Sequence, residues 1–154
     1  MRRLAMAILA LGLVACLDVP GNDTAPDNPS DPATETFSST FNPPIVIKNM
    51  TKTDLGDYYQ DLKAGTGAEL DASTTVVFSY QTWLKNGQLV DQVVGGEVNL
   101  NTVVRGLQDG MVGMREGGER IVVVPSALAF GPFINGPIPA NSTLVFDVVL
   151  SEIP

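Results

Sequence analysis

The stretch that decides the fold runs from Ile138 to Leu150 and reads IPANSTLVFDVVL. Its second half alternates strictly: one face carries Leu144, Phe146, Val148 and Leu150, and the other carries Thr143, Val145, Asp147 and Val149. Apolar residues at every second position predict a β-strand with one face against a core. This strand therefore marks where a sheet and its core should lie.

Three more strands are predicted upstream of this one. The segment Thr74–Leu84 alternates in the same way, and its apolar face carries Val76, Phe78 and Tyr80. An Asn86-Gly87 pair follows, which is a strong hairpin-turn signal, so Leu89–Val94 can return as the neighbouring strand. The segment Arg120–Val124 is a short run rich in β-branched residues, as expected for a further strand.

One segment, Thr102–Met114, is predicted to be helical. Its apolar residues share a face at helical spacing: Val103, Leu107, Met111 and Met114. Three glycines weaken it, each by about 1 kcal/mol relative to alanine: Gly106, Gly110 and Gly113. Such a helix should be short and held by packing, and its glycines indicate a close approach to the sheet. The predicted fold class is therefore α+β, an antiparallel sheet with one short helix against it.

The composition excludes several kinds of catalysis. The 154 residues include no histidine and one cysteine, Cys16. A Ser-His-Asp triad, cysteine–histidine catalysis and zinc sites built from Cys and His are therefore excluded. The net charge of −8, from 17 acidic and 9 basic residues, repels phosphate, so we expect no nucleic-acid partner. Carboxylate, hydroxyl or backbone chemistry remains, or an apolar pocket that acts without a reactive side chain.

The N-terminus carries a targeting pattern. A basic start, Met1-Arg2-Arg3, precedes the apolar run Leu4–Ala15, which is too short to span a bilayer and is typical of a signal peptide. The run ends in Leu13-Val14-Ala15-Cys16, which resembles the lipobox of bacterial lipoproteins. This resemblance implies a signal peptide over residues 1–15 and a lipid on Cys16 that anchors the chain to a membrane. The alternative is an ordinary secretory peptide with an incidental cysteine.

Residues 16–44 differ in composition from the rest of the chain. Between Leu17 and Pro44 there are six prolines, five acidic residues and no basic residue. Such a segment cannot bury enough apolar area to offset its ordering entropy. We therefore predict that residues 16–44 are a lipidated cysteine followed by a disordered acidic tether, and that residues 45–154 fold. Leu17 after the cysteine favours the outer over the inner membrane, with the domain facing the periplasm.

Short motifs run through the folded part in a fixed order. They are Gly65-Thr66-Gly67, Phe78-Ser79-Tyr80, Asp91, residues 103–111 (VVRGLQDGM), Ala129-Phe130-Gly131 and residues 138–148 (IPANSTLVFDV). In this order and spacing the series resembles the FKBP family of prolyl isomerases, from about Asp54 to Ile153. The last motif is the most specific of them. The resemblance implies an antiparallel sheet of five or six strands curled around one short helix, with a substrate cleft between sheet and helix.

The resemblance also implies a function, the cis–trans isomerisation of X–Pro bonds in proline-containing polypeptides, with no metal or cofactor. Carried over position by position, the catalytic residues are Tyr80, Asp91, Phe130 and Phe146. The substrate-binding residues are Val90, Val103, Val104, Leu107 and Ile138. We expect a lipid-anchored monomer that assists the folding of cell-envelope proteins. On periodicity alone, Tyr80 and Phe146 would be ordinary core residues, and Asp91 would be a solvated loop acid.

Several positions depart from the family's pattern. Leu107 stands where many members have tryptophan, Val90 where phenylalanine is usual, and Phe130 where tyrosine is usual. Gly95–Val98 lacks a further aromatic wall, and Phe133, in an altered loop, is the candidate substitute. A missing aromatic could cost about 1 kcal/mol or more of substrate binding. We therefore expect reduced activity, and the alternative function is a weak or inactive module that binds proline-containing partners.

Overall fold

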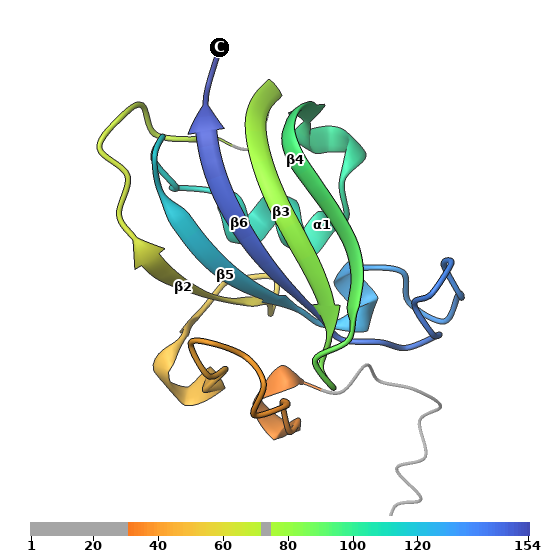
Figure 1. The fold of residues 1–154 in the computed structure, drawn as a ribbon. Coiled ribbons are helices and arrows are strands. Elements are labelled where there is room, and N and C mark those ends of the chain that lie inside the picture. The colour runs from red at the N-terminus through yellow and green to blue at the C-terminus, as the bar shows by residue number, and fades with distance from the viewer. Residues whose placement is uncertain (1–30, 72–74) are drawn as a thin grey trace, which may run out of the picture.

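The computed structural model describes residues 31–71 and 75–154, which form a six-stranded antiparallel sheet with one α-helix behind it (Figure 1). The strands are β1 (Thr51–Lys52), β2 (Tyr58–Lys63), β3 (Thr75–Leu84), β4 (Leu89–Asn99), β5 (Glu119–Val124) and β6 (Leu144–Glu152). Their spatial order is β1-β2-β5-β6-β3-β4. The helix α1 (Arg105–Met111) crosses the sheet on the far side in this view. The predicted α+β fold with one short helix is confirmed.

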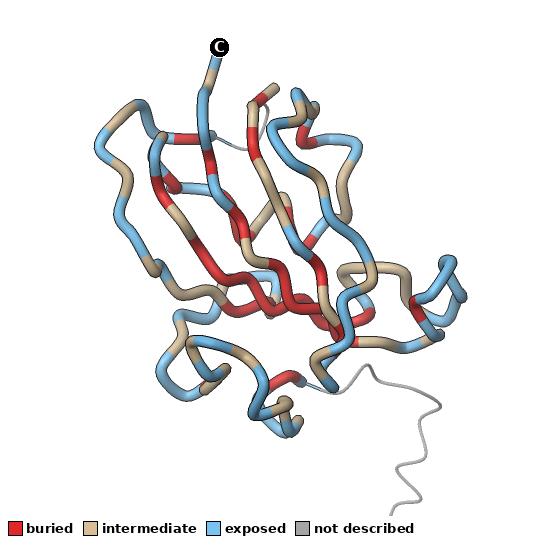
Figure 2. The backbone as a smooth tube through the Cα atoms, viewed as in Figure 1, coloured by how far each residue is buried: buried red, intermediate tan, exposed pale blue. Residues whose placement is uncertain are grey.

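The alternating strands bury the faces that the sequence predicts. The main core lies between the sheet and α1, and its members from β3 and β6 are Val76, Phe78, Leu84, Leu144, Phe146, Val148 and Leu150. Val145 points to the opposite face, which we call the outer face, and joins a second buried cluster there. Figure 2 shows the buried segments concentrated along β5 and β6, with further buried residues in both halves of β3.

Helix α1 is shorter than predicted. It spans Arg105–Met111 rather than Thr102–Met114, because Val103 and Val104 are extended and a 3-10 turn, η3 (Leu100–Thr102), precedes them. Gly113 lies beyond the end of α1 with a φ of 76°, a left-handed conformation that glycine adopts without strain. Gly113 therefore accounts for the early C-terminal end of the helix, and the extended Val103 and Val104 account for its late start.

Two glycines allow α1 to lie directly on β5. A Cβ added to Gly106 would overlap the side chain of Val124, and one added to Gly110 would overlap that of Val122. Both valines are fully buried. The predicted close approach of helix to sheet is therefore confirmed at these two positions.

The strand predictions miss one edge of the sheet. Neither β1 nor β2 is predicted, and β4 runs on to Asn99 rather than ending at Val94. Strand β2 is formed by pairing with β5, where Tyr58 lies opposite Val123 and Gln60 opposite Ile121. Its burial does not alternate cleanly, so a period-2 pattern could not reveal it.

Residues 31–46, here called the N-terminal strap, pack on the outer face of the sheet. The strap residues Phe37, Phe41 and Ile45 contact the outer cluster, whose buried members are Ile47, Tyr58, Ile121, Val123 and Val145. The rings of Phe41 and Trp83 meet edge to face, with their centroids 6.2 Å apart. The strap therefore covers apolar side chains that would otherwise be exposed.

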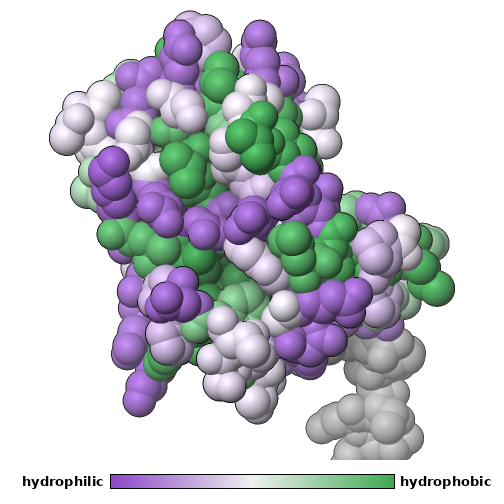
Figure 3. Space-filling model, viewed as in Figure 1, coloured by the Kyte–Doolittle hydropathy of each residue, from purple (hydrophilic) through white to green (hydrophobic). Residues whose placement is uncertain are grey.

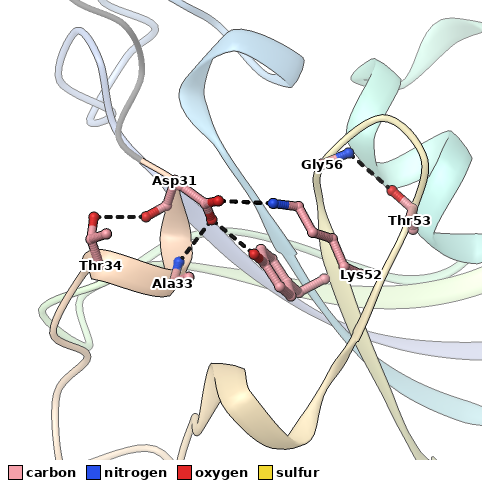
Figure 4. A network of polar contacts seen from close by, with 7 residues as sticks. Asp31, Ala33, Thr34, Lys52, Thr53 and Gly56 are labelled. Carbon is pink, nitrogen blue, oxygen red and sulfur yellow. Dashed lines mark hydrogen bonds and ion pairs between the residues drawn. The ribbon is translucent and has the colours of Figure 1, made fainter.

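Polar contacts fasten the strap to the domain. Asp31 accepts hydrogen bonds from Lys52 Nζ (2.8 Å) and from the Tyr58 hydroxyl (2.9 Å) (Figure 4). The hydrogen bond from Lys52 is the main reason why the pKa of Asp31 falls to about 2. Further along, Glu35 pairs with Lys85 (2.8 Å) and accepts a hydrogen bond from the Thr143 hydroxyl (2.5 Å).

These contacts correct the predicted tether for residues 31–44, which are packed rather than extended from the domain. The prediction weighed the prolines and acids and overlooked the two apolar anchors Phe37 and Phe41. The predicted signal peptide, Cys16 and the first part of the tether lie outside the described residues. In residues 31–71 and 75–154, no helix has both the length and the hydropathy needed to cross a membrane.

Candidate functional site

A cleft of about 370 Å³ lies between the sheet and the start of α1. Its walls come from β3, β4, β6, residues 102–104, α1 and the loop 130–138. All nine residues predicted for the site line this one cleft: Tyr80, Val90, Asp91, Val103, Val104, Leu107, Phe130, Ile138 and Phe146. Residues up to 66 positions apart in the chain are thus brought together in one place.

The floor of the cleft is apolar. Leu107 of α1, Phe146 of β6 and Ile138 of the loop are 1%, 5% and 6% exposed. Leu107 reaches the floor because its neighbour Gly106 lets the helix approach β5. Phe146 reaches it because alternation along β6 directs this side chain to the core face. The floor therefore suits a small apolar ring.

One polar pair stands on the wall. The Tyr80 hydroxyl donates a hydrogen bond to Asp91 Oδ2 (2.8 Å), and the Gln92 N–H donates to Asp91 Oδ1 (2.8 Å). The rings of Tyr80 and Phe146 lie with their centroids 6.3 Å apart. Burial, and next the bond to Asp91, raise the pKa of Tyr80 to about 12, so this hydroxyl stays protonated at neutral pH.

A β-bulge explains why two consecutive residues of β4 reach the cleft. In the pairing of β3 with β4, Thr82 lies opposite Asp91 but Trp83 lies opposite Leu89, which leaves Val90 as an extra residue. A bulge of this kind bends the strand and re-aims side chains. Both Val90 and Asp91 therefore line the cleft, although strict alternation would turn one of them away.

The backbone between η3 and α1 offers a hydrogen-bond donor to the cleft. Val103 and Val104 are extended, and the Gln108 side chain donates to the Val103 carbonyl (3.0 Å). Within the described ranges, the Val104 N–H has no protein acceptor. It can therefore donate a hydrogen bond to a ligand carbonyl, because an unpaired backbone N–H away from water costs free energy.

The loop after Phe130 differs from expectation at one position. Phe130, Asn135, Gly136, Pro137 and Ile138 line the cleft. Phe133 does not line the cleft and is 73% exposed. The expectation that Phe133 replaces a missing aromatic wall is therefore wrong, because the loop turns its side chain outwards.

Sequence reasoning missed six residues that line the cleft: Thr82, Thr102, Asn135, Gly136, Pro137 and Leu144. Two of them had a signal, since Thr82 shares the alternating face of Tyr80 and Leu144 that of Phe146. Thr82 is 2% exposed, and its hydroxyl oxygen finds no hydrogen-bond partner among the described residues. The loop residues carry no periodic pattern, so the sequence alone could not place them.

The comparisons with known proteins agree with this geometry. The model of the family described as FKBP-type peptidyl-prolyl cis-trans isomerase matches residues 67–151. An FK506-binding protein of Neisseria meningitidis is 32% identical over 101 residues, which cover 61% of this chain and 93% of that protein. The crystal structure of FkpA from Escherichia coli superposes with a TM-score of 0.62 at 33% identity, covering 69% of this chain and 52% of that one.

Longer relatives contain the same domain. FK506-binding protein 4 of Mycosarcoma maydis is 39% identical over 108 residues, which cover 67% of this chain. The chain spans less than a third of the length of this relative and of the other fungal proteins of that name that it matches. The likeness therefore concerns the cleft-bearing domain, which both the family match and the superposed fold cover. The chain belongs to the FKBP-type peptidyl-prolyl cis-trans isomerase family.

Proposed function

We propose that this chain catalyses cis–trans isomerisation of X–Pro bonds in polypeptides of the cell envelope. The observation that carries the proposal is the convergence of the Tyr80–Asp91 pair and the Phe146 ring over the Leu107 floor. This arrangement holds an apolar cavity beside one polar pair, which fits a proline ring and its adjoining carbonyl. A chain without histidine can perform this reaction because it needs no nucleophile.

The proposed mechanism rests on differential binding of the twisted amide. The barrier to rotation about a peptide bond is about 18–20 kcal/mol and arises from amide resonance. In the twisted transition state this resonance is lost, so the carbonyl oxygen and the nitrogen are less polarised than in the planar amide. An apolar cleft therefore disfavours the planar form more than the twisted form, which lowers the barrier.

Each wall of the cleft has a proposed role. Phe146, Ile138 and Val103 grip the proline ring above Leu107. The Val104 N–H donates to a carbonyl of the substrate and fixes its register. Asp91, held by Tyr80 and by its own neighbour's amide, orients the twisting carbonyl electrostatically and does not act as a base.

The proposed location follows from the N-terminal pattern. Lipid on Cys16 would hold the domain at a membrane surface facing the periplasm, and Leu17 favours the outer membrane. With the strap packed on the domain, the linker between lipid and domain would be residues 17–30, shorter than composition predicts. Replacing Cys16 by alanine in a Gram-negative host should move the protein from the membrane to the soluble fraction.

A second candidate is supported by the thinned aromatic wall. Val90, Leu107 and Phe130 stand where the family's pattern has larger or hydroxylated aromatics, and Phe133 points away from the cleft. Each change reduces contact with a proline ring or removes a hydrogen bond. In this alternative the cleft binds proline-containing partners without accelerating isomerisation, and the chain acts as a monomeric binding module.

The test follows the cis-to-trans conversion of Leu-Pro and Phe-Pro tetrapeptides by the purified full-length chain in mild detergent. We expect catalysis above background that Asp91→Ala and Phe146→Leu each lower at least about tenfold in kcat/KM. Glu97→Ala is the matched control, because it removes an exposed acid of the same strand outside the cleft. Thermal unfolding of each variant shows whether the fold is retained.

The outcomes separate the two candidates. Activity that depends on Asp91 and Phe146, with the Glu97 variant unchanged, supports the isomerase. A folded wild-type chain with no activity on peptides carrying several residues before proline, yet with saturable binding of those peptides, would overturn the isomerase in favour of the binding module.

A further inference from the structure

Two large apolar side chains stand exposed beside the cleft. Phe133 and Ile134 are 73% and 75% exposed, and they are consecutive in the loop 130–138. In Figure 1 this loop projects to the right of the sheet, and Figure 3 shows hydrophobic surface at the same margin of the molecule. Contiguous exposed apolar groups at a functional rim commonly mark a binding surface.

The loop holds this pair in a defined position. At its base the Gly131 N–H donates to the Ser126 carbonyl (2.8 Å) and the Asn141 N–H donates to the Gly131 carbonyl (2.7 Å). Within it, Asn135 and Ile138 exchange both backbone hydrogen bonds, at 3.0 and 2.9 Å. The Phe133 N–H donates to the Phe130 carbonyl (3.3 Å). A closed network of this kind presents the two side chains outwards by its own geometry.

The exposed pair is continuous with the cleft. The cleft is lined by Phe130, which precedes the exposed pair, and by Asn135–Ile138, which follow it. Phe133 and Ile134 themselves do not line the cleft. A polypeptide whose proline occupies the cleft must leave it past some part of this rim. The pair is therefore placed to meet a residue that flanks the proline in the sequence of the substrate.

The charge pattern defines the kind of substrate. No Asp, Glu, Lys or Arg occurs between Ile121 and Phe146, although the chain carries 17 acidic and 9 basic residues. The whole rim loop is thus uncharged, so it can recognise its partner by burial of apolar area but not by ion pairing. Apolar side chains near a proline are accessible in unfolded polypeptides and are mostly buried in folded ones.

We propose that Phe133 and Ile134 form a capture site for an apolar side chain of an unfolded client, a few residues from the proline held in the cleft. The proposal rests on the proposed isomerase function and deepens it by naming the substrate class. The capture site adds affinity for long unfolded chains and contributes nothing to short peptides, which fill the cleft alone.

The test compares two substrates with the full-length chain. One is a Leu-Pro tetrapeptide, and the other is a reduced, unfolded protein whose refolding is limited by an X–Pro bond. The variant Phe133→Ser/Ile134→Ser should keep kcat/KM on the tetrapeptide within twofold and lose about tenfold on the unfolded protein. Val94→Ser is the matched control, because Val94 is also exposed (87%). The preceding residue, Val93, pairs with the cleft residue Tyr80. The Val94 side chain therefore lies on the sheet face opposite the cleft.

Each other outcome has a definite meaning. An equal loss on both substrates would overturn the capture site, because it would show that the substitutions disturb the cleft itself. An unchanged rate on both would overturn it too. If the wild type catalyses neither reaction, the proposed function fails. Fluorescence anisotropy with a labelled unfolded chain then tests the capture site alone. Weaker binding by the double variant would support the capture site, and equal binding would reject it. Sedimentation that shows a dimer in the wild type and a monomer in the double variant, with client binding unchanged, would assign the pair to a second copy of the chain and overturn the proposal.

Discussion

At the scale of single residues, the buried Asp57 and the half-buried Asp109 of α1 form a pair of carboxyl groups. Asp57 is fully buried, and it accepts a hydrogen bond from the Thr53 hydroxyl (2.7 Å). The Oδ2 atoms of Asp57 and of Asp109 in α1 find no hydrogen-bond partner within the described part of the chain. Burial first, and then the charge of Asp109, raise the pKa of Asp57 from 3.8 to about 6.

This pair makes stability depend on pH. Because the folded state binds the proton of Asp57 more tightly than the unfolded chain does, its contribution is complete below pH 3.8 and is lost as the pH rises through about 6. We expect the free energy of unfolding to fall as the pH rises from 3.8 to about 6. The variant Asp57→Asn keeps an acceptor for Thr53 without the charge, so it should flatten this fall by on the order of 1 kcal/mol.

Urea unfolding at several pH values measures this effect. The exposed Asp54→Asn is the control, since it lies near the same turn and is not buried. Parallel stability curves for the wild type and Asp57→Asn across this pH range would contradict the assignment.

At the scale of elements, α1 is held directly against β5 by both packing and hydrogen bonds. Gly110 brings the helix against Val122, and Arg120 of β5 donates to the carbonyls of Gly110 (2.9 Å) and Val112 (3.0 Å). Arg120 is itself held by Asp61 (2.6 Å) and stacks over the Tyr59 ring, 4.1 Å from its centroid. The end of the helix is therefore fastened by a buried cation as well as by packing.

The substitution Gly110→Ala tests whether helix propensity or packing against β5 has the larger effect on stability at this position. Alanine favours an exposed helix by about 1 kcal/mol, but here its Cβ would overlap Val122. We expect a net loss of about 1–3 kcal/mol in the free energy of unfolding, the usual cost of an overpacked core. Arg105→Ala, at an exposed position of the same helix, should change stability little. A Gly110→Ala variant as stable as the wild type would show that the helix can move away from β5 without cost.

At the scale of the whole molecule, the N-terminal strap belongs to the folded unit. It covers the outer cluster with Phe37 and Phe41, and Glu35 ties it to Lys85 and to Thr143, the residue before β6. The strap thus reaches the segment that leads from Ile138 into Phe146. Its removal would uncover one face of the sheet and loosen one end of the cleft.

A pair of truncations tests the role of the strap. A chain that begins at residue 45 should lose about 2 kcal/mol or more of unfolding free energy relative to one that begins at residue 31. The reason is that the shorter chain lacks the partly buried rings of Phe37 and Phe41. Thermal unfolding and a dye that binds exposed apolar surface measure this difference. Equal stability of the two truncations would contradict a structural role, and Phe37→Ala in the full-length chain should reproduce part of the loss.

Much of the fold and the identity of the cleft residues could be predicted from the sequence. Alternation in Thr75–Leu84 and Leu144–Leu150 determined which faces are buried, because side chains of a strand point to opposite sides in turn. The order of the motifs indicated the nine residues that meet in the cleft. These features are local or repeat along the chain, so a linear pattern carries them.

Only the tertiary structure decided the rest. Strand β2 exists because β5 offers it a pairing edge, Val90 reaches the cleft through a bulge, and Phe133 turns outwards because its loop closes on its own hydrogen bonds. The strap is ordered because Phe37 and Phe41 find the outer cluster, whereas its composition alone predicts disorder. Strand β2 and the strap depend on partners that are distant in the sequence. The Val90 bulge and the Phe133 loop depend on backbone hydrogen bonds that leave no periodic pattern in the side chains.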